Sequence, residues 1–385
     1  MPMKLEPSLI GVVAAALVVA LLISLVSTPV VKNLAAKVGA VDVPKDNRRM
    51  HDHPIPRMGG LAIFFGFVLS VLIFAELTPQ LRGMLLGASM IVVLGIFDDI
   101  YALKALPKLF VQIAAALVAV CSGNVIEALS NPNIFSSDPY WELGILKIPF
   151  TVLWIVAITN AVNLIDGLDG LACGVSTISS MTLLVIALVM EEPDVAILMG
   201  ALSGACIGFL PYNLNPAKIF MGDTGSTFLG FILAVVSIQG LFKFYAIISF
   251  AVPFLMLGLP IFDTCFAILR RVSHGQSPMA PDRGHIHHRL IDMGFTQKQA
   301  VAVLYIISAI LGLSAVVLTT IGVVRAMLFL LALCAAGAVA GKLYLDRTSG
   351  SEPSPSSGSS RVAKPRQSHP MESGNYFGEE DQSDK

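Results

Sequence analysis

Apolar runs long enough to cross a lipid bilayer repeat along most of this chain. A run of roughly 17–25 apolar residues is a candidate for a membrane-spanning helix. The runs lie at 8–28, 59–77, 82–97, 107–123, 148–163, 174–190, 195–211, 225–242, 244–263, 299–320 and 324–345. Because several are short or adjoin one another, we expect about 11 spanning helices, with ten as the alternative count. The sequence thus predicts an all-α polytopic membrane protein.

The composition agrees with this fold class. Hydrophobic residues make up 55% of the chain and charged residues only 13%, whereas soluble domains average about 25% charged residues. The cysteines form no CxxC pair, so we expect them to behave as small apolar residues. The net charge of −1 does not indicate a nucleic-acid partner.

The two ends of the chain differ in character. The first apolar run is longer than the ~7–15-residue apolar core of a signal peptide, so we expect an uncleaved span there. Beyond residue 347 the chain is rich in Ser, Pro and Gly, a composition that cannot bury enough apolar surface to fold. We therefore expect a membrane domain over 1–347 and a disordered cytoplasmic tail over 348–385.

Lysine and arginine are distributed unevenly between the two sets of alternating connections. The connections that follow the odd-numbered runs hold most of these residues, and the other side holds only Lys4, Arg82, Lys147, Lys243 and Arg325. The positive-inside rule makes the first side cytoplasmic, with the N-terminus outside and the C-terminus inside. Every polar motif also falls on the cytoplasmic side: RMHDHPIPRMGG, DDIYALKALPK, NLIDGLDG, NLNPAKIFMGDTGS and PDRGHIHHRL. This convergence predicts one site on the cytoplasmic face.

Two adjacent aspartates, Asp98 and Asp99, end the third apolar run. They could simply end the helix in water at the membrane interface. Like charges repel, however, and one of the pair would tend to hold a proton unless a metal ion or another cation lies nearby. Lys104 and Lys108 could supply positive charge or hold a phosphate.

Two further motifs supply more carboxylates. One glycine-rich stretch contains Asn163, Asp166, Gly167 and Asp169. This stretch is either a structural turn or a segment whose backbone approaches a ligand. The spacing is not that of an EF-hand. Asp223 precedes an apolar run, where it could cap a helix or help to hold a phosphate. No GK[ST] follows it, so this is not a Walker A loop.

Histidines and arginines cluster in the last polar motif. The cluster comprises Arg283, His285, His287, His288 and Arg289. Such a density of histidine could indicate zinc, but no cysteine lies near and the arginines would repel a cation. Arginine beside histidine suits anion binding, since a guanidinium holds phosphate in two-point contact. A basic loop that faces anionic lipid headgroups is the alternative.

Aspartates that can hold Mg²⁺ and basic groups that can hold phosphates therefore share one membrane face. Phosphoryl transfer from a soluble phosphorylated donor to a lipid phosphate would use all of these groups. An ion-coupled membrane transporter is the competing class, because acidic residues in membrane helices commonly mark ion pathways. These acids, however, lie at the ends of spans. A third hypothesis is a degenerate relative that only binds lipid or partners.

The ordered motifs DD, NLIDGLDG, FMGDTGS and GHIHH resemble those of the polyprenyl-phosphate N-acetylhexosamine-1-phosphate transferases, glycosyltransferase family 4. The resemblance covers roughly residues 10–345. The HIHHRL form looks like the branch that transfers GlcNAc-1-phosphate from UDP-GlcNAc to undecaprenyl phosphate at the start of teichoic acid or O-antigen synthesis. The branch that moves phospho-MurNAc-pentapeptide usually carries three consecutive histidines, whereas this chain reads His-Ile-His-His, which disfavours that branch. Another UDP-HexNAc or UDP-MurNAc-pentapeptide is the alternative donor.

The resemblance implies a role for each matching residue. Asp98, Asp99, Asp166, Asp169, His287 and His288 would be catalytic, with Asp98 as the candidate base. Asp223 would hold Mg²⁺, or Mn²⁺ in its place, with Asp99 beside the metal. Lys108, Asn163, Gly167, Asn213, Phe220, Arg283 and His285 would bind substrate, and Phe220 would stack on uracil. Ala102 departs from the peptidoglycan branch, which has a lysine at that position.

The same resemblance implies a multi-pass protein of the plasma membrane whose partners are UDP-GlcNAc, undecaprenyl phosphate and the bilayer. It leaves open a homodimer, and it leaves open both a one-step transfer and a two-step route through an aspartyl-phosphate.

Overall fold

The computed structural model describes residues 7–44, 53–130, 140–240, 246–276 and 284–321, together with 328 and 331. Within these residues the chain is almost entirely helical. The helices are α1 (Pro7–Val38), α2 (Gly60–Phe74), α3 (Pro79–Tyr101), α4 (Ala105–Cys121), α5 (Lys147–Leu164), α6 (Leu171–Val189), α7 (Pro193–Asn213), α8 (Gly222–Gly240), α9 (Ala246–Met256), α10 (Gly258–Ser273), α11 (Ile286–Asp292) and α12 (Gln297–Ile321). The prediction of an all-α chain is confirmed for this part of it.

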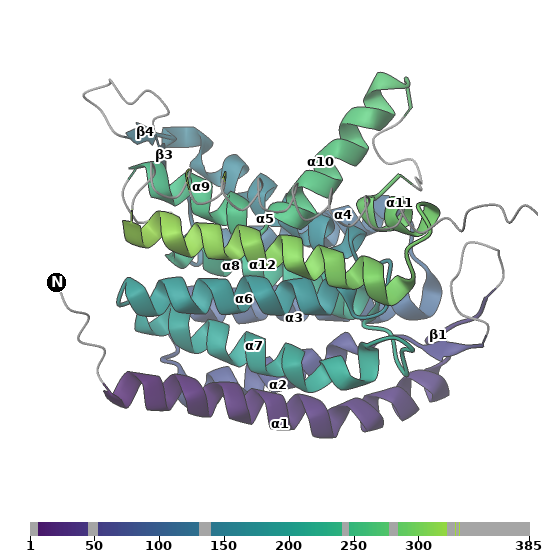
Figure 1. The fold of residues 1–385 in the computed structure, drawn as a ribbon. Coiled ribbons are helices and arrows are strands. Elements are labelled where there is room, and N and C mark those ends of the chain that lie inside the picture. The colour runs from purple at the N-terminus through teal and green to yellow at the C-terminus, as the bar shows by residue number, and fades with distance from the viewer. Residues whose placement is uncertain are drawn as a thin grey trace, which may run out of the picture. The chain divides into compact units, whose positions relative to one another are not determined.

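Two short antiparallel strand pairs join these helices. Strand β1 (Val41–Asp42) pairs with β2 (Ile55–Pro56), and β3 (Ala128–Ser130) pairs with β4 (Tyr140–Glu142). The first pair carries the chain from the end of α1 back to the start of α2. It therefore holds the segment before α2 at the end of the helical bundle (Figure 1).

Most helices lie side by side, as a membrane protein requires. Helix α1 packs on α7, α7 on α6 and α6 on α12, in the order in which Figure 1 shows them stacked. Six of the described helices are long and apolar enough to cross a membrane, and α2 and α4 are shorter apolar helices. The predicted runs 59–77 and 107–123 thus correspond to helices of 15 and 17 residues, below and at the lower limit for a spanning helix. The run 324–345 and the tail 348–385 lie almost wholly outside the described residues.

The predicted run 244–263 is not one helix, and this part of the prediction was wrong. The chain forms α9, breaks at Leu257, and continues as α10, which leaves the bundle at an angle (Figure 1). Pro260 explains the break, because a proline has no N–H and its ring clashes with the carbonyl four residues earlier, here that of Met256. Helix α10 buries one face, which includes Asp263, and exposes large apolar side chains such as Phe262.

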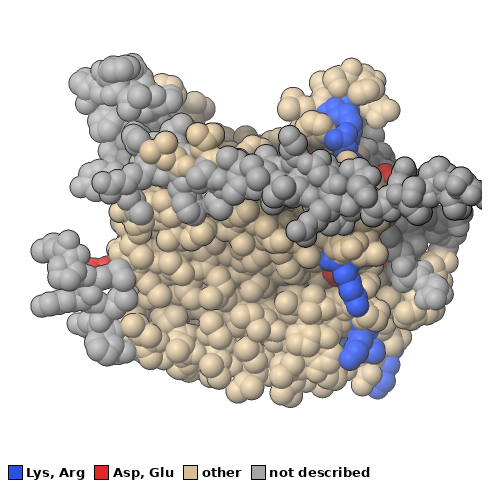
Figure 2. Space-filling view, viewed as in Figure 1, with Lys and Arg blue, Asp and Glu red and all other residues tan. Residues whose placement is uncertain are grey.

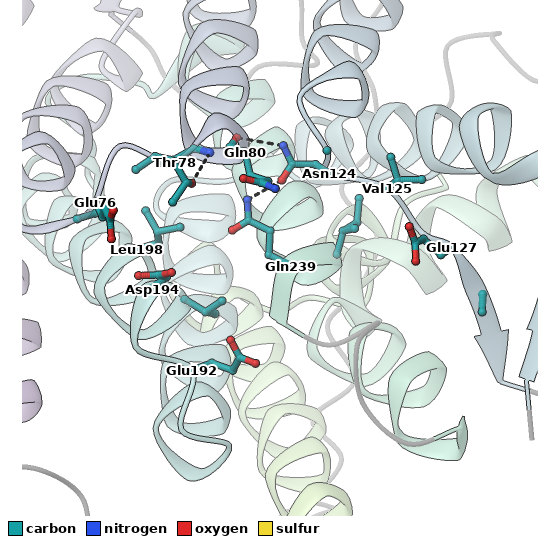
Figure 3. Close-up of a pocket in the computed structure, with 16 residues that line it drawn as sticks. Glu76, Thr78, Gln80, Asn124, Val125, Glu127, Glu192, Asp194, Leu198 and Gln239 are labelled. Carbon is teal, nitrogen blue, oxygen red and sulfur yellow. Dashed lines mark hydrogen bonds between the residues drawn. The ribbon is translucent and has the colours of Figure 1, made fainter.

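Charge is concentrated at the two ends of the bundle. Figure 2 shows a broad middle zone without charged side chains, and the lysines and arginines on this face gather toward the end that holds α11 and the C-terminus of α1. The opposite end contains a pocket of about 660 Å³ (Figure 3). Its lining includes the acidic side chains of Glu76, Glu127, Glu192 and Asp194. No residue of the predicted site lines this pocket.

Candidate active site

The predicted site residues meet where the C-termini of α3 and α5 approach the N-termini of α4 and α8. Close backbone contact makes this meeting possible. A Cβ atom on Gly95 of α3 would lie 2.4 Å from the Cα of Thr224, and one on Gly60 of α2 would lie 2.0 Å from the Cα of Gly225. Only glycine leaves room for contacts this close. The first turn of α8 is therefore held directly against α2 and α3.

Asp99 lies at the centre of this contact, and the protein uses both of its oxygens. Oδ1 accepts hydrogen bonds from the backbone N–H of Asp223 (3.0 Å) and from Nε of Arg57 (3.0 Å). Oδ2 accepts from the N–H and the hydroxyl of Thr224, at 3.1 and 2.6 Å. A carboxylate at a helix N-terminus satisfies otherwise unpaired N–H groups. Asp99 thus acts as a cap for α8 that is contributed by another helix.

Asp98 points to a different partner. Its Oδ1 accepts from the N–H of Leu103 (2.7 Å), and its Oδ2 lies 2.9 Å from the ammonium of Lys108. The same ammonium lies 3.0 Å from Oδ2 of Asp223. Ala102, with a positive φ of 51°, makes the turn that brings Leu103 and then Lys108 back to Asp98. One lysine therefore bridges two carboxylates from α3 and α8.

The loop between α5 and α6 completes this side of the site. Asn163, in the last turn of α5, places its side-chain amide next to Asp223. Asp166 is half-buried, and its burial, together with the negative charges of Asp223 and Asp99, raises the pKa of its carboxyl to about 8. This excess of negative charge is an environment in which a cation is favoured.

Asp169 serves to hold the loop in place. Its Oδ2 accepts from the amide of Asn215 (2.9 Å) and from the N–H of Ala217 (3.0 Å). The hydroxyl of Tyr305 in α12 donates to the carbonyl of Gly170 at 2.6 Å. These bonds fix the α5–α6 loop against the α7–α8 loop and α12, so the structure gives Asp169 a positioning contact.

Asn213 is the last residue of α7, and Phe220 lies on the α7–α8 loop. The buried amide of Asn213 donates to the carbonyl of Ile219 at 3.1 Å, which closes the loop on itself. Phe220 is partly exposed, and its N–H donates to the carbonyl of Pro56 at 2.8 Å. The stacking role of Phe220 and the donor contact of Asn213 stay predictions.

The histidines form a second cluster. The rings of His285 and His287 are nearly parallel, with centroids 5.7 Å apart. The ring centroids of His287 and His288 are 4.3 Å apart. His287 lies against the α5–α6 loop, because a Cβ atom on Gly167 would be 2.2 Å from its Nε2. Burial and the neighbouring His288 lower the pKa of His287 to about 4, so its ring is neutral near pH 7. The structure thus joins the histidine motif to the aspartate loop, while Arg283 lies outside the described residues.

The donor groups fit a hard divalent cation that is shared with a substrate. Within the described ranges, no group of three or more His, Cys, Asp or Glu side chains could hold a metal ion. Asp98 and Asp223 nevertheless share one ammonium group, so they face a position that accepts positive charge. Mg²⁺ is commonly bound by one or two carboxylates, with water and substrate phosphates as its other ligands. Asp223 suits that arrangement better than Asp99, whose oxygens already accept protein hydrogen bonds.

Three contacts at the candidate site were missed by the sequence interpretation. Arg57 pairs with Asp99, Thr224 donates to it, and Asp263 contacts His285. Arg57 lies in a motif that the sequence placed at the site but to which it gave no role. Asp263 was detectable as a lone acid in an apolar run, since such residues usually have a functional or paired role.

Comparison with known proteins identifies the family. The family description "Glycosyl transferase family 4" matches residues 81–241. A Bacillus subtilis protein named "Probable undecaprenyl-phosphate N-acetylglucosaminyl 1-phosphate transferase" is 47% identical over 80% of this chain and 85% of its own length. The chain therefore belongs to glycosyl transferase family 4. It is a membrane enzyme of the phospho-sugar transferase type.

Two more distant relatives carry related names. A "Decaprenyl-phosphate N-acetylglucosaminephosphotransferase" from Mycolicibacterium smegmatis is 35% identical over 78% of this chain and 79% of its own length. An "Undecaprenyl-phosphate alpha-N-acetylglucosaminyl 1-phosphate transferase" from Escherichia coli K12 is 30% identical over 73% of this chain and 77% of its own length. The resemblance noted from the sequence motifs is confirmed.

Replacing Gly167 by alanine should raise the KM for the phospho-sugar donor by about tenfold, equivalent to about 1.4 kcal/mol. The added methyl group would overlap the ring of His287 and separate the histidine cluster from the aspartate loop. Steady-state kinetics of the purified enzyme measure this change. Gly11→Ala is the matched control, because a Cβ atom there meets nothing within 4 Å. An unchanged donor KM in Gly167→Ala would show that this contact is not needed for donor binding.

Proposed function

We propose that this enzyme transfers GlcNAc-1-phosphate from UDP-GlcNAc to undecaprenyl phosphate and releases UMP. The observation that carries the proposal is the bridge from Asp98 through Lys108 to Asp223, next to Asn163 and the α5–α6 loop. This arrangement offers carboxylates for a metal, an ammonium for a phosphate and a polar loop for a nucleotide sugar within one site. The names of the relatives support the sugar and the lipid carrier.

Each side chain of the site has a separate role in the proposed reaction. Lys108 binds the phosphate of the lipid acceptor as a point charge, and Asp98 orients that phosphate or removes its residual proton. A phosphate has a second pKa of about 6, so most of the acceptor is already a dianion at neutral pH. An acceptor oxygen forms the new bond to the donor phosphorus that carries GlcNAc, and the bond to the UMP oxygen breaks. Asp223 would hold Mg²⁺, or Mn²⁺ in its place, and the bound ion would supply positive charge to neutralise the diphosphate and stabilise the leaving UMP.

The site opens to the cytoplasm of the cell in this proposal, and the enzyme lies in the plasma membrane. Lysine and arginine gather toward the end of the bundle that holds the site, as the positive-inside rule requires of a cytoplasmic end (Figure 2). The N-terminus is then outside and the C-terminus inside. A homodimer stays a prediction.

The direct test is transfer by the purified protein. We expect label from UDP-[¹⁴C]GlcNAc to enter the organic phase only when undecaprenyl phosphate and Mg²⁺ are present. Chelation with EDTA should remove the activity, and added Mg²⁺ or Mn²⁺ should restore it. Decaprenyl phosphate tests the alternative acceptor, and UDP-GalNAc and UDP-MurNAc-pentapeptide test the alternative donors. If label stays in the aqueous phase with every UDP-sugar, the proposal is wrong.

Release of UMP in the absence of an acceptor separates the two routes. A burst of UMP equal to the enzyme concentration indicates an aspartyl-phosphate intermediate, and its absence supports direct attack by the lipid phosphate. Full activity in Asp98→Asn would exclude both proposed roles of Asp98.

A further inference from the structure

Asp263 is a buried acid on α10 that contacts the start of α11. Its side chain is only 3% exposed. Oδ2 lies 2.8 Å from Nδ1 of His285, and Oδ1 accepts the backbone N–H of Ile286 at 2.8 Å. Both oxygens are thus used on two consecutive residues. One carboxylate fixes the ring of His285 and the first turn of α11 as a single unit.

This contact determines which nitrogen of His285 is available for a substrate. An ionised carboxylate can only accept hydrogen bonds, so Nδ1 of His285 must carry the proton that faces Oδ2. Nε2 is then the nitrogen left to meet other groups. Carboxylate partners of functional histidines commonly set the tautomer and the ring orientation in this way.

The orientation of His285 extends to the aspartate loop. Its ring lies nearly parallel to that of His287, at an interplanar angle of 9°, and both rings are buried. His287 in turn lies against Gly167. A change at Asp263 would therefore displace a stack of rings whose far end touches the α5–α6 loop at Gly167, next to Asp166.

We propose that Asp263 is a positioning residue for the sugar-nucleotide donor and that it acts through His285. The proposal rests on the proposed function and on the prediction from the motif resemblance that His285 binds substrate, here the sugar-nucleotide donor. Asp263 itself contacts no substrate in this arrangement. It determines where His285 points and which nitrogen carries the proton.

The test is a double-mutant cycle with separate kinetics for the two substrates. Asp263→Ala should raise the KM for UDP-GlcNAc by about 10–100-fold, the size of effect found when the partner of a metal-bound histidine is removed. The KM for undecaprenyl phosphate should change less than about twofold. In the His285→Ala background, Asp263→Ala should add less than about twofold, because two residues that act through one contact are not additive.

A second variant separates positioning from folding. Asp263→Asn keeps an oxygen for the N–H of Ile286 but can present an amide N–H to Nδ1, which favours the other tautomer of His285. We expect a raised donor KM at an unchanged melting temperature in detergent. Thr264→Val is the control on the same helix. Its hydroxyl has no hydrogen-bond partner among the described residues, so its kinetics should match those of the wild type.

The outcomes distinguish this inference from the proposed function. A wild-type enzyme that transfers GlcNAc-1-phosphate, together with Asp263 variants that have normal donor KM values, overturns the positioning role alone. Additive effects of Asp263→Ala and His285→Ala, or equal increases in both KM values, overturn it as well. A wild-type enzyme without transfer activity overturns the proposed function first.

Discussion

Asp223→Asn should lower kcat/KM for GlcNAc-1-phosphate transfer by at least about 100-fold, equivalent to about 2.7 kcal/mol of lost transition-state stabilisation. Asp223 is the carboxylate at the N-terminus of α8 that shares the ammonium of Lys108 with Asp98. Asparagine keeps the size of the side chain but removes the charge that would hold a divalent cation. The label-transfer assay measures the loss, and a titration with Mg²⁺ shows whether the remaining activity needs a higher metal concentration.

Glu127→Gln is the matched control for this loss. It removes one negative charge in the same way, but at the opposite end of the bundle, in the pocket of Figure 3. We expect wild-type kinetics and an unchanged requirement for Mg²⁺. An Asp223→Asn enzyme with normal kcat/KM and normal dependence on Mg²⁺ would contradict the assignment of Asp223 as the metal-binding carboxylate.

Asp99→Asn should destabilise the folded protein by about 3 kcal/mol and should also inactivate it. Breaking a buried charge pair costs about 3–5 kcal/mol, because the remaining charge loses its partner. We take the lower end because Arg57 is 26% exposed while the Asp99 side chain is 0% exposed. Asparagine also leaves one oxygen where Asp99 has two, so the N–H groups at the start of α8 cannot all be satisfied. Thermal unfolding in detergent measures the stability.

The comparison with Asp98→Asn decides between two roles for Asp99. We expect Asp98→Asn to lose transfer activity while its melting temperature stays near that of the wild type, since Lys108 still has Asp223 as a partner. Asp99→Asn should instead unfold at a lower temperature. If Asp99→Asn keeps the wild-type melting temperature but requires more Mg²⁺, Asp99 is a metal ligand, as the motif resemblance predicted.

The helices could largely be read from the sequence, because the bilayer imposes a simple rule. A segment within lipid must satisfy its own backbone hydrogen bonds, so long apolar runs become helices. The exception was the run 244–263, which hydropathy alone predicted as one helix. Pro260 interrupts that helix, and α10 continues in a different direction. That break places Asp263 beside His285.

The residues that make up the site could also be predicted from the sequence. Each motif combines charged or polar residues that are costly near a membrane unless they are paired or have a function. The pairing between motifs was not readable. Arg57 and Thr224 meet Asp99 across 42 and 125 positions of the chain. Such contacts depend on how the helix ends pack, and no local pattern records them.

The sequence by itself determined that this protein is a membrane-embedded helical enzyme with its aspartates, lysine and histidines on one face. Only the tertiary structure decided how Asp98 and Asp99 divide their roles. Adjacent residues on an α-helix point about 100° apart. Asp99 therefore faces the first turn of α8 and Arg57, whereas Asp98 faces Lys108. The physical reason is that packing in three dimensions decides the hydrogen-bond partners of a side chain. Two residues that are adjacent in the sequence can therefore have different partners.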